Sequence, residues 1–228
     1  MVELNEARVH AGDIITLSHL QDRPGRQSVQ YAQVPLPFDL SIEVNASTML
    51  AEINAWQEEK RPSLTVFLAQ GAAKALRAFP LLNATFVSED SLKLHSSVNI
   101  AIAVDSAAGL VFPVLEDVNN RPIADLETSL KALSEQASRG SLSSEDMHES
   151  TFSLHNLGMF GICDFRAPIY APQTASLAVG TIDYRLVMTG NRIINLPVFK
   201  VKLSCDPRVI DMAMAAGFLA KLKDVLEE

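Results

Sequence analysis

The sequence predicts an α/β fold of the α+β two-layer sandwich type, in which helices pack on a mixed sheet. Several strand-like segments follow one another without a helix between them, and a few helix-like segments are spread along the chain. Strict alternation of the two would instead indicate a doubly wound parallel sheet. The chain has 228 residues, 48% hydrophobic and 20% charged, which suits one globular domain with a sizeable core.

The beginning of the chain differs from the rest. Residues 1–29 are poorly periodic and are expected to form an N-terminal arm, with a loop from Ser18 to Ser28. Regular patterns start at Gln30, so residues 30–228 are expected to form the domain. Apolar and polar residues alternate from Phe38 to Asn45, which indicates a half-buried strand.

Two helices are expected next. Thr48 to Glu59 has the spacing of an amphipathic helix. Ser63 is suited to cap the second helix, Leu64 to Phe79, because its hydroxyl can accept a hydrogen bond from an unpaired backbone N–H. Apolar residues recur on most sides of this second helix, so it should be largely buried, and Pro80 should end it.

The remaining elements are a set of strands and two more helices. One helix is expected from Ile123 to Arg139, stopped by Gly140, and a last one from about Arg208 to Leu226. The strands share short apolar or alternating runs: Asn83 to Val87, Val98 to Val104, Leu110 to Leu115, Ser150 to His155, Thr174 to Val179, Tyr184 to Met188 and Val198 to Cys205. The turn Ala107 to Gly109 should join the strands Val98 to Val104 and Leu110 to Leu115.

Charge and hydropathy exclude two classes of partner. The net charge is −8 and the pI is about 5.1, which argues against nucleic-acid binding, because nucleic-acid binders usually carry a basic face. No apolar run is long enough to span a membrane, so we expect no membrane partner.

The cysteines and histidines do not indicate a metal site. Cys163 and Cys205 lie far apart in the sequence and suggest reduced thiols in a cytoplasmic protein, with Cys205 as a small core residue. We therefore expect no metal. Four histidines lack the spacing of metal ligands: His10, His19, His95 and His148.

Five segments along the chain carry recognisable motifs: PLLNATF from Pro80, the run from Val98 to Leu126, TFSLHNLGMFGICDF from Thr151, APIYAPQTASLAVGTI from Ala167, and LSCDPRVIDM, residues 203–212. In this order they resemble the catalytic domain of 2-oxoacid dehydrogenase acyltransferases (E2), relatives of chloramphenicol acetyltransferase. The last segment is similar to the family signature LSxDHRxxDG, and the resemblance extends over roughly residues 30–228.

The resemblance implies a fold, an assembly and a substrate. It implies a chloramphenicol-acetyltransferase-like fold in a homotrimer whose active sites are channels between neighbouring subunits. Coenzyme A or an acyl-CoA would enter from one side and the acyl acceptor from the other. Lipoyl domains precede this domain in complete dehydrogenase subunits, and the sequence begins with Met1 almost at the domain itself. We therefore expect a protein that stands alone.

The family's general base is missing. The His of LSxDHRxxDG takes a proton from a thiol or hydroxyl, and Pro207 stands at its position. Proline has no titratable group and no N–H, so it cannot replace that histidine. Arg208 and Asp211 match the signature, and Met212 replaces its glycine.

A histidine has been gained at a second motif position. In the family a serine before Asn-Leu-Gly donates a hydrogen bond to the oxyanion of the tetrahedral intermediate, and His155 stands there. Since both positions face one reaction centre in the family, His155 could act as general base or acid. The alternative is a histidine that entered an inactive cleft and has no function.

The other candidate residues are assigned by motif position. Asp211 would orient the active-site segment, or form an ordinary ion pair with Arg208 at the start of the last helix. Asp206 could also cap this helix, with Pro207 in its first turn. The expected channel residues are Ser204, Asp206, Asn156, Tyr170 and Met212, of which the last two would reshape the pocket.

We therefore expect a stand-alone E2-like acyltransferase that moves an acyl group from a CoA or carrier thioester to a small-molecule acceptor. Acetyl is the acyl group that we expect. A carrier protein would then be a possible partner, and specialised metabolite biosynthesis a possible setting. Two alternatives stay open. One is a non-catalytic core subunit of E2 type. The other is the same fold recruited to a different reaction, such as cyclisation or elimination.

Overall fold

The computed structural model describes residues 3–4, 7–8, 36–88, 91–106 and 109–228. The loop expected from Ser18 to Ser28 and the first two residues of the expected turn at 107–109 lie outside the described residues, as does most of the N-terminal arm. Within that arm, strands β1 (Glu3–Leu4) and β2 (Ala7–Arg8) pair antiparallel.

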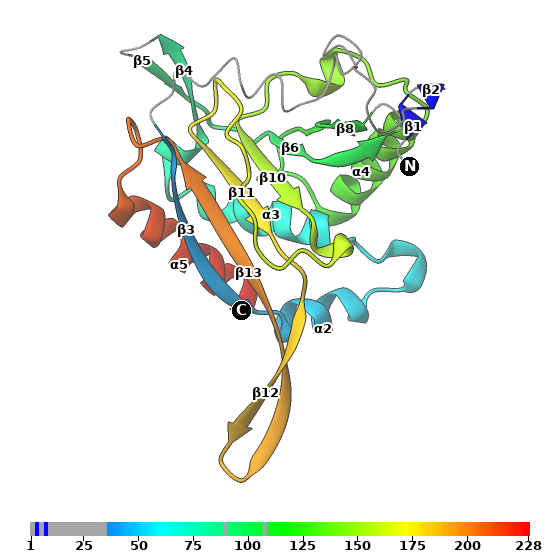
Figure 1. The fold of residues 1–228 in the computed structure, drawn as a ribbon, viewed down its shortest axis with the longest axis vertical. Coiled ribbons are helices and arrows are strands. Elements are labelled where there is room, and N and C mark those ends of the chain that lie inside the picture. Colours follow the sequence, from blue (N-terminus) through cyan, green and yellow to red (C-terminus); the bar gives the residue numbers. More distant parts are fainter. Residues whose placement is uncertain (1–2, 5–6, 9–35, 89–90, 107–108) are drawn as a thin grey trace.

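One mixed sheet of seven strands forms the centre of the molecule, as the sequence predicts (Figure 1). Its strand order is β12-β13-β11-β10-β6-β9, and β3 also pairs with β13. β10 runs parallel to β6 and to β11, while the other pairs are antiparallel. The strands are β3 (Phe38–Asn45), β6 (Ile100–Ile102), β9 (Val114–Leu115), β10 (Phe152–Asn156), β11 (Ala175–Val179), β12 (Asp183–Thr189) and β13 (Arg192–Cys205).

Two short hairpins lie beside this sheet. They are formed by β4 (Ala84–Ser88) with β5 (Ser91–Leu94), and by β7 (Val104–Ser106) with β8 (Gly109–Val111). The expected strands 98–104 and 110–115 are therefore each split between the main sheet and the second hairpin. Pro113 falls in the break of the latter, where its missing N–H removes a ladder hydrogen bond.

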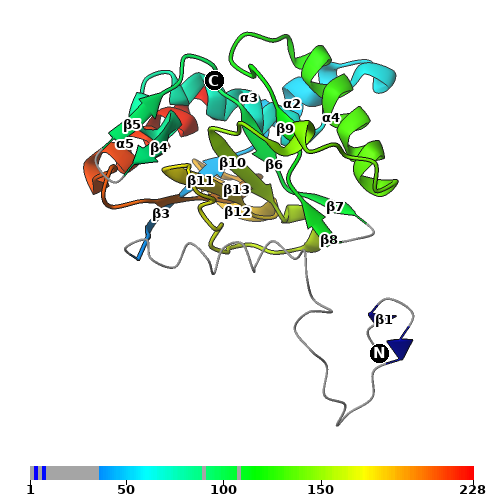
Figure 2. The ribbon, with the colours of Figure 1, turned by 90° about the horizontal axis from the view of Figure 1, so that it is seen from above.

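Four helices cover one face of the sheet (Figure 2). They are α2 (Ser47–Ala55), α3 (Leu64–Leu76), α4 (Ile123–Ser138) and α5 (Met212–Glu227). The expected two-layer arrangement is confirmed. None of the described helices is long and apolar enough to cross a membrane.

The helix ends confirm some predictions and correct others. Ser63 caps α3 as expected, since Val66 N donates to its Oγ over 3.3 Å, and most of α3 is buried. α4 ends where predicted, before Gly140 with φ +65°. α2 ends at Ala55, earlier than expected, and a 3-10 turn, Glu58–Lys60, follows it.

The expected start of the last helix was wrong. α5 begins at Met212, and its cap is Asp211, whose Oδ1 accepts from Met214 N over 2.7 Å. Pro207 and Asp206 therefore do not belong to the helix. The Asp206 carbonyl accepts the N–H groups of Val209 and Ile210, which closes a separate turn before α5.

The two faces of the sheet differ in chemistry. On β10, Phe152 and Leu154 face the helices and are fully buried in the apolar core. Because side chains alternate along a strand, Ser153 and His155 face the other way. The segment from Gly161 to Thr174 covers this second face, and its Ala167 carbonyl accepts from Ser176 Oγ over 3.2 Å. His155 thus lies between the sheet and a loop.

Candidate functional site

His155 lies in a buried position near the end of β10. Its side chain is 4% exposed, and its Nε2 atom is buried without a hydrogen-bond partner in the described structure. An unsatisfied buried nitrogen costs about 1–3 kcal/mol, so such groups usually have a functional or structural reason. The expected site residue is therefore present, but enclosed.

Two aromatic rings enclose the imidazole. Tyr170 stacks on His155 with ring centroids 5.9 Å apart and planes 20° apart, and Phe112 lies 5.4 Å from it. Phe112 and Tyr170 also contact each other, with ring centroids 4.8 Å apart. Burial lowers the pKa of His155 from 6.5 to about 4, so the ring is neutral near pH 7.

The loop over the second sheet face is fixed by charged pairs. Arg166 binds the Asp39 carboxylate on β3, and Asp164 binds Lys202 on β13. β3 and β13 are neighbouring strands, so both pairs attach the part of the loop before Tyr170 to the same region of the sheet. The partners in each pair lie far apart in the sequence and no motif links them, so the sequence alone does not predict these pairs.

The segment at Pro207 has a different environment. Pro207 is exposed in the turn that follows β13. Next to it, Asp206 is 1% exposed and accepts from Arg208 through the backbone N and the guanidinium, at 2.6–3.2 Å. Arg208 also lies over the Phe86 ring, 4.2 Å from its centroid. Ser204 is fully buried, and its Oγ has no hydrogen-bond partner among the described residues.

One chain does not bring His155 and Pro207 together. The register pairs His155 with Ala178 on β11, and Ala178 with Lys202 on β13. Pro207 lies five residues further along and two strands away, so at normal strand spacings the two positions are on the order of 20 Å apart. A common reaction centre would therefore need two copies of the chain.

The remaining expected residues separate into structural and exposed groups. Asp211 caps α5, and Met212 is 66% exposed at its start. Asn156 links two elements: its Nδ2 donates to Thr65 Oγ1 over 3.1 Å and its Oδ1 accepts from Gly158 N over 3.0 Å. It therefore fixes the turn after β10.

Asn156 also lines an apolar cleft of about 460 Å³, which no sequence motif indicates. The cleft opens between β6, the second hairpin, α4 and the turn after β10. Most of its wall is apolar, with a few polar groups. Its lining residues are Thr65, Ile102, Ala103, Val104, Asp105, Leu110, Leu130, Ser134, Asn156, Leu157, Met159 and Phe160.

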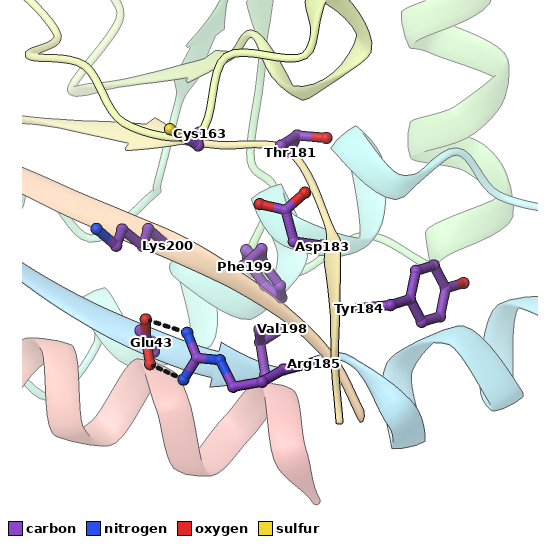
Figure 3. Close-up of a pocket in the computed structure, with 9 residues that line it drawn as sticks. All are labelled: Glu43, Cys163, Thr181, Asp183, Tyr184, Arg185, Val198, Phe199 and Lys200. Carbon is purple, nitrogen blue, oxygen red and sulfur yellow. Dashed lines mark hydrogen bonds and ion pairs between the residues drawn. The ribbon is translucent and has the colours of Figure 1, made fainter. Parts of the chain in front are cut away.

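A smaller pocket of about 170 Å³ lies where the β12–β13 hairpin leaves the body (Figure 3). Arg185 makes two hydrogen bonds to Glu43, at 2.9 and 3.0 Å, and Lys200 and the exposed Cys163 stand nearby. The Arg185–Glu43 pair attaches β12 to β3. Across the described residues, no three His, Cys, Asp or Glu side chains come together as metal ligands.

Comparison with known sequences gives one family. Residues 28–228 match the model of the 2-oxoacid dehydrogenases acyltransferase (catalytic domain). A similar curated protein is the dihydrolipoyllysine-residue acetyltransferase component of the pyruvate dehydrogenase complex of Rickettsia prowazekii. It is 36% identical over 196 residues, 83% of this chain and 48% of that protein. The chain thus spans about half the length of the curated relatives it matches.

Comparison with solved structures agrees. A probable dihydrolipoamide acetyltransferase from Listeria monocytogenes matches with a TM-score of 0.85 and 28% identity, covering 96% of each chain. The cubic core of the pyruvate dehydrogenase multienzyme complex has the same fold, with a TM-score of 0.85 at 23% identity, over 98% of this chain and 93% of the other. Chloramphenicol acetyltransferase shares the fold at 10% identity, with a TM-score of 0.52 over 94% and 99% of the two chains.

Proposed function

The chain belongs to the family of 2-oxoacid dehydrogenase acyltransferase catalytic domains, and from this premise we propose that it transfers an acyl group, acetyl first of all, from coenzyme A or a carrier thioester to a small-molecule acceptor. His155 is the proposed catalytic residue. The observation that carries the proposal is its buried, unpartnered Nε2 at the motif position of the oxyanion serine, in a chain that has proline at the position of the base.

The neutral state of His155 supports this role. With a pKa of about 4, nearly all of the imidazole is unprotonated near pH 7 and can accept a proton. The acceptor hydroxyl or thiol loses its proton to the ring as its oxygen or sulfur attacks the thioester carbonyl. The tetrahedral intermediate then expels the coenzyme A thiolate, which takes the proton back from the ring. The protonated ring exists only within this cycle.

The same ring can act in a second way. If Nε2 carries the proton, a neutral imidazole donates a hydrogen bond to the oxyanion, as the family serine does. The low pKa of His155 disfavours the charged imidazolium as the resting donor. The first role needs the acceptor hydroxyl or thiol at the ring nitrogen, and the second needs the acyl carbonyl oxygen there. Both roles are lost when His155 is replaced.

The proposed working form is a homotrimer with active sites between copies. Two observations support it. In one chain His155 and Pro207 stand on the order of 20 Å apart, and the β12–β13 hairpin exposes a row of large apolar side chains. The related cubic core is itself an assembly, although the proposal for this chain rests on the two observations above.

The stand-alone, specialised role is part of the proposal. Pro207 and His155 both depart from the signature of the lipoyl-transferring enzymes, and Tyr170 encloses the new histidine. These changes support an acceptor other than a lipoyl thiol. The two free thiols, Cys163 and Cys205, fit a reducing compartment such as the cytoplasm.

The test is a thiol-release assay with acetyl-CoA and a panel of hydroxyl, amine and thiol acceptors. We expect turnover by the natural protein and a loss of at least about 100-fold in His155→Ala. The matched control is His148→Ala, an exposed histidine that bonds locally to the Ser144 carbonyl and should keep full activity. Equal turnover in the natural protein and His155→Ala would remove His155 from the mechanism.

A non-catalytic core subunit is the second candidate. Pro207 favours it, because the motif position of the family's base has no proton acceptor. A base with a pKa near 4 is also weak. If neither coenzyme A nor acetyl-CoA binds in equilibrium dialysis while the protein still assembles, this second function is the better one. Binding without turnover would instead favour a changed reaction, such as cyclisation or elimination.

A further inference from the structure

The side-chain amide of Gln173 links two elements through both of its polar atoms. Gln173 is 3% exposed and lies just before β11. Its Oε1 accepts from Ser153 Oγ on β10 over 2.7 Å, and its Nε2 donates to Ser150 Oγ over 2.7 Å. The amide therefore ties the loop over the sheet to β10 and to the residue that leads into it.

Gln173 also ends the turn that carries Tyr170. Its backbone N–H donates to the Tyr170 carbonyl over 2.9 Å. Ser153 and His155 are two residues apart on β10, so their side chains share one face. At one end of the turn the Gln173 amide accepts a hydrogen bond from Ser153, and at the other end the Tyr170 ring stacks on His155.

The outer side of the turn is held by β4. Phe86 N donates to the Pro172 carbonyl over 2.8 Å, and Thr85 forms an antiparallel bridge with Gln173. The turn is thus held by backbone contacts on one side and by the buried amide on the other. These backbone contacts go to β4, whereas the Gln173 side chain is bonded to Ser153 on β10 and to Ser150 before it.

We propose that Gln173 is a positioning residue for the His155 site: its amide holds the Tyr170 turn against Ser153, which keeps Tyr170 stacked on His155 and water away from the imidazole. The inference rests on the proposed function for the importance of His155, and it adds the residue that sets the surroundings of the ring. Gln173 does not contact substrate in this proposal.

The surroundings of His155 indicate what should change. Burial is the cause of its lowered pKa, with no charged group contributing. Among the described residues, the aromatic rings in contact with the imidazole are Phe112 and Tyr170, and its register partner on β11 is Ala178. Of these three, Tyr170 carries a titratable group. If the turn loosens, water reaches the imidazole and its pKa should rise toward 6.5.

The experiment is an NMR titration of the His155 ring between about pH 3.5 and 8. We expect a midpoint near 4 in the natural protein and a rise of about one unit or more in Gln173→Leu, with a smaller rise in Ser153→Ala. The matched control is Thr174→Val, at the residue after Gln173, which removes the partly buried hydrogen bond of 2.8 Å from Thr174 Oγ1 to the Leu81 carbonyl. We expect Thr174→Val to lose about as much stability as Gln173→Leu and to leave the His155 midpoint unchanged.

The outcomes separate this proposal from the proposed function. A folded Gln173→Leu whose midpoint stays near that of the natural protein overturns it, as does an equal shift in Thr174→Val. If Gln173→Leu does not fold, Ser153→Ala and the milder Ser150→Ala are titrated instead. A His155 midpoint that is unchanged in both of these variants overturns the proposal. Since the titration needs no turnover, a shift in an inactive protein supports the positioning role while the acyltransferase proposal fails.

Discussion

At the scale of the residue, burial keeps the imidazole of His155 neutral in the folded protein, so the free energy of unfolding depends on pH. An unfolded histidine has a pKa of about 6.5, whereas the folded value is about 4. As pH falls from 6.5 to 4, the unfolded state binds a proton that the folded state does not, so stability falls with pH in this window. The total loss from this group is about 3 kcal/mol.

Urea unfolding at pH 7 and pH 4.5 tests this directly. We expect His155→Leu to lose less stability than the natural protein between these pH values, by about 2–3 kcal/mol. His148→Leu, at an exposed histidine, should keep the natural pH dependence. The same loss in the natural protein and in His155→Leu would contradict a buried neutral ring.

The two departures from the family motif can be reversed together. Pro207 is exposed in a turn, so Pro207→His should fold, and His155→Ser reproduces the family's oxyanion residue. In the double variant we expect acetyl transfer to dihydrolipoamide to rise by about 100-fold or more, the usual effect of a positioned base. The control is His155→Ser alone, which should show no gain in acetyl transfer to dihydrolipoamide. No gain in the double variant would mean that other parts of the pocket have changed as well.

At the scale of the element, the start of α5 gives a structural role to Asp211, a residue that the motif also suggests for the site. Asp211 accepts a hydrogen bond from Met214 N and so satisfies a free N–H of the first turn. Asp211→Ala should lower the free energy of unfolding by about 1 kcal/mol, and Asp211→Asn by less, because asparagine also caps.

Thermal unfolding and the thiol-release assay together separate the two roles of Asp211. A cap alone predicts normal activity in Asp211→Asn at a temperature where the protein is folded. A stable Asp211→Asn that has lost activity would show that the carboxylate also orients the active-site segment, as the family resemblance implies.

β13 shows how one element joins two parts of the molecule. Its C-terminal half pairs with β3 and β11, and its N-terminal half pairs with β12 in the hairpin that extends from the body (Figure 1). The sequence predicted only residues 198–205 of this strand, because Pro197 and Asn195 interrupt the apolar pattern before it. Pairing with β12 across the hairpin extends the strand to Arg192.

At the scale of the whole molecule, the β12–β13 hairpin is the exposed surface that fits contact between copies. Tyr184, Leu186 and Met188 alternate along β12, and Ile193 pairs with Met188, so all four share one face; they are 65–73% exposed. Such a continuous apolar face on an extended ribbon is typical of an interface.

Replacing this face should change the oligomeric state. We expect Leu186→Asp with Met188→Asp to convert the proposed trimer to monomer in sedimentation velocity, and to abolish activity if the site lies between copies. The matched control is Val87→Asp on β4, an equally exposed valine (69%) outside this face, which should leave the trimer intact. A monomeric natural protein, or a double variant that stays trimeric, would contradict this interface.

The sequence by itself determined the kind of fold, the strand at residues 38–45, the capped and buried α3, and the family, because side-chain period, caps and motif residues are local properties of the chain. It also singled out His155 and Pro207 by their motif positions. What it could not give was which groups surround them.

Only the tertiary structure decided that Phe112 and Tyr170 enclose His155, that Gln173 ties the Tyr170 turn to β10, and that Pro207 lies far from His155 in one chain. These relations depend on strand order and register, which bring together residues from separate segments, and no spacing within a segment encodes them. For the same reason the pKa of His155 follows from burial between sheet and loop, which only the packed structure contains.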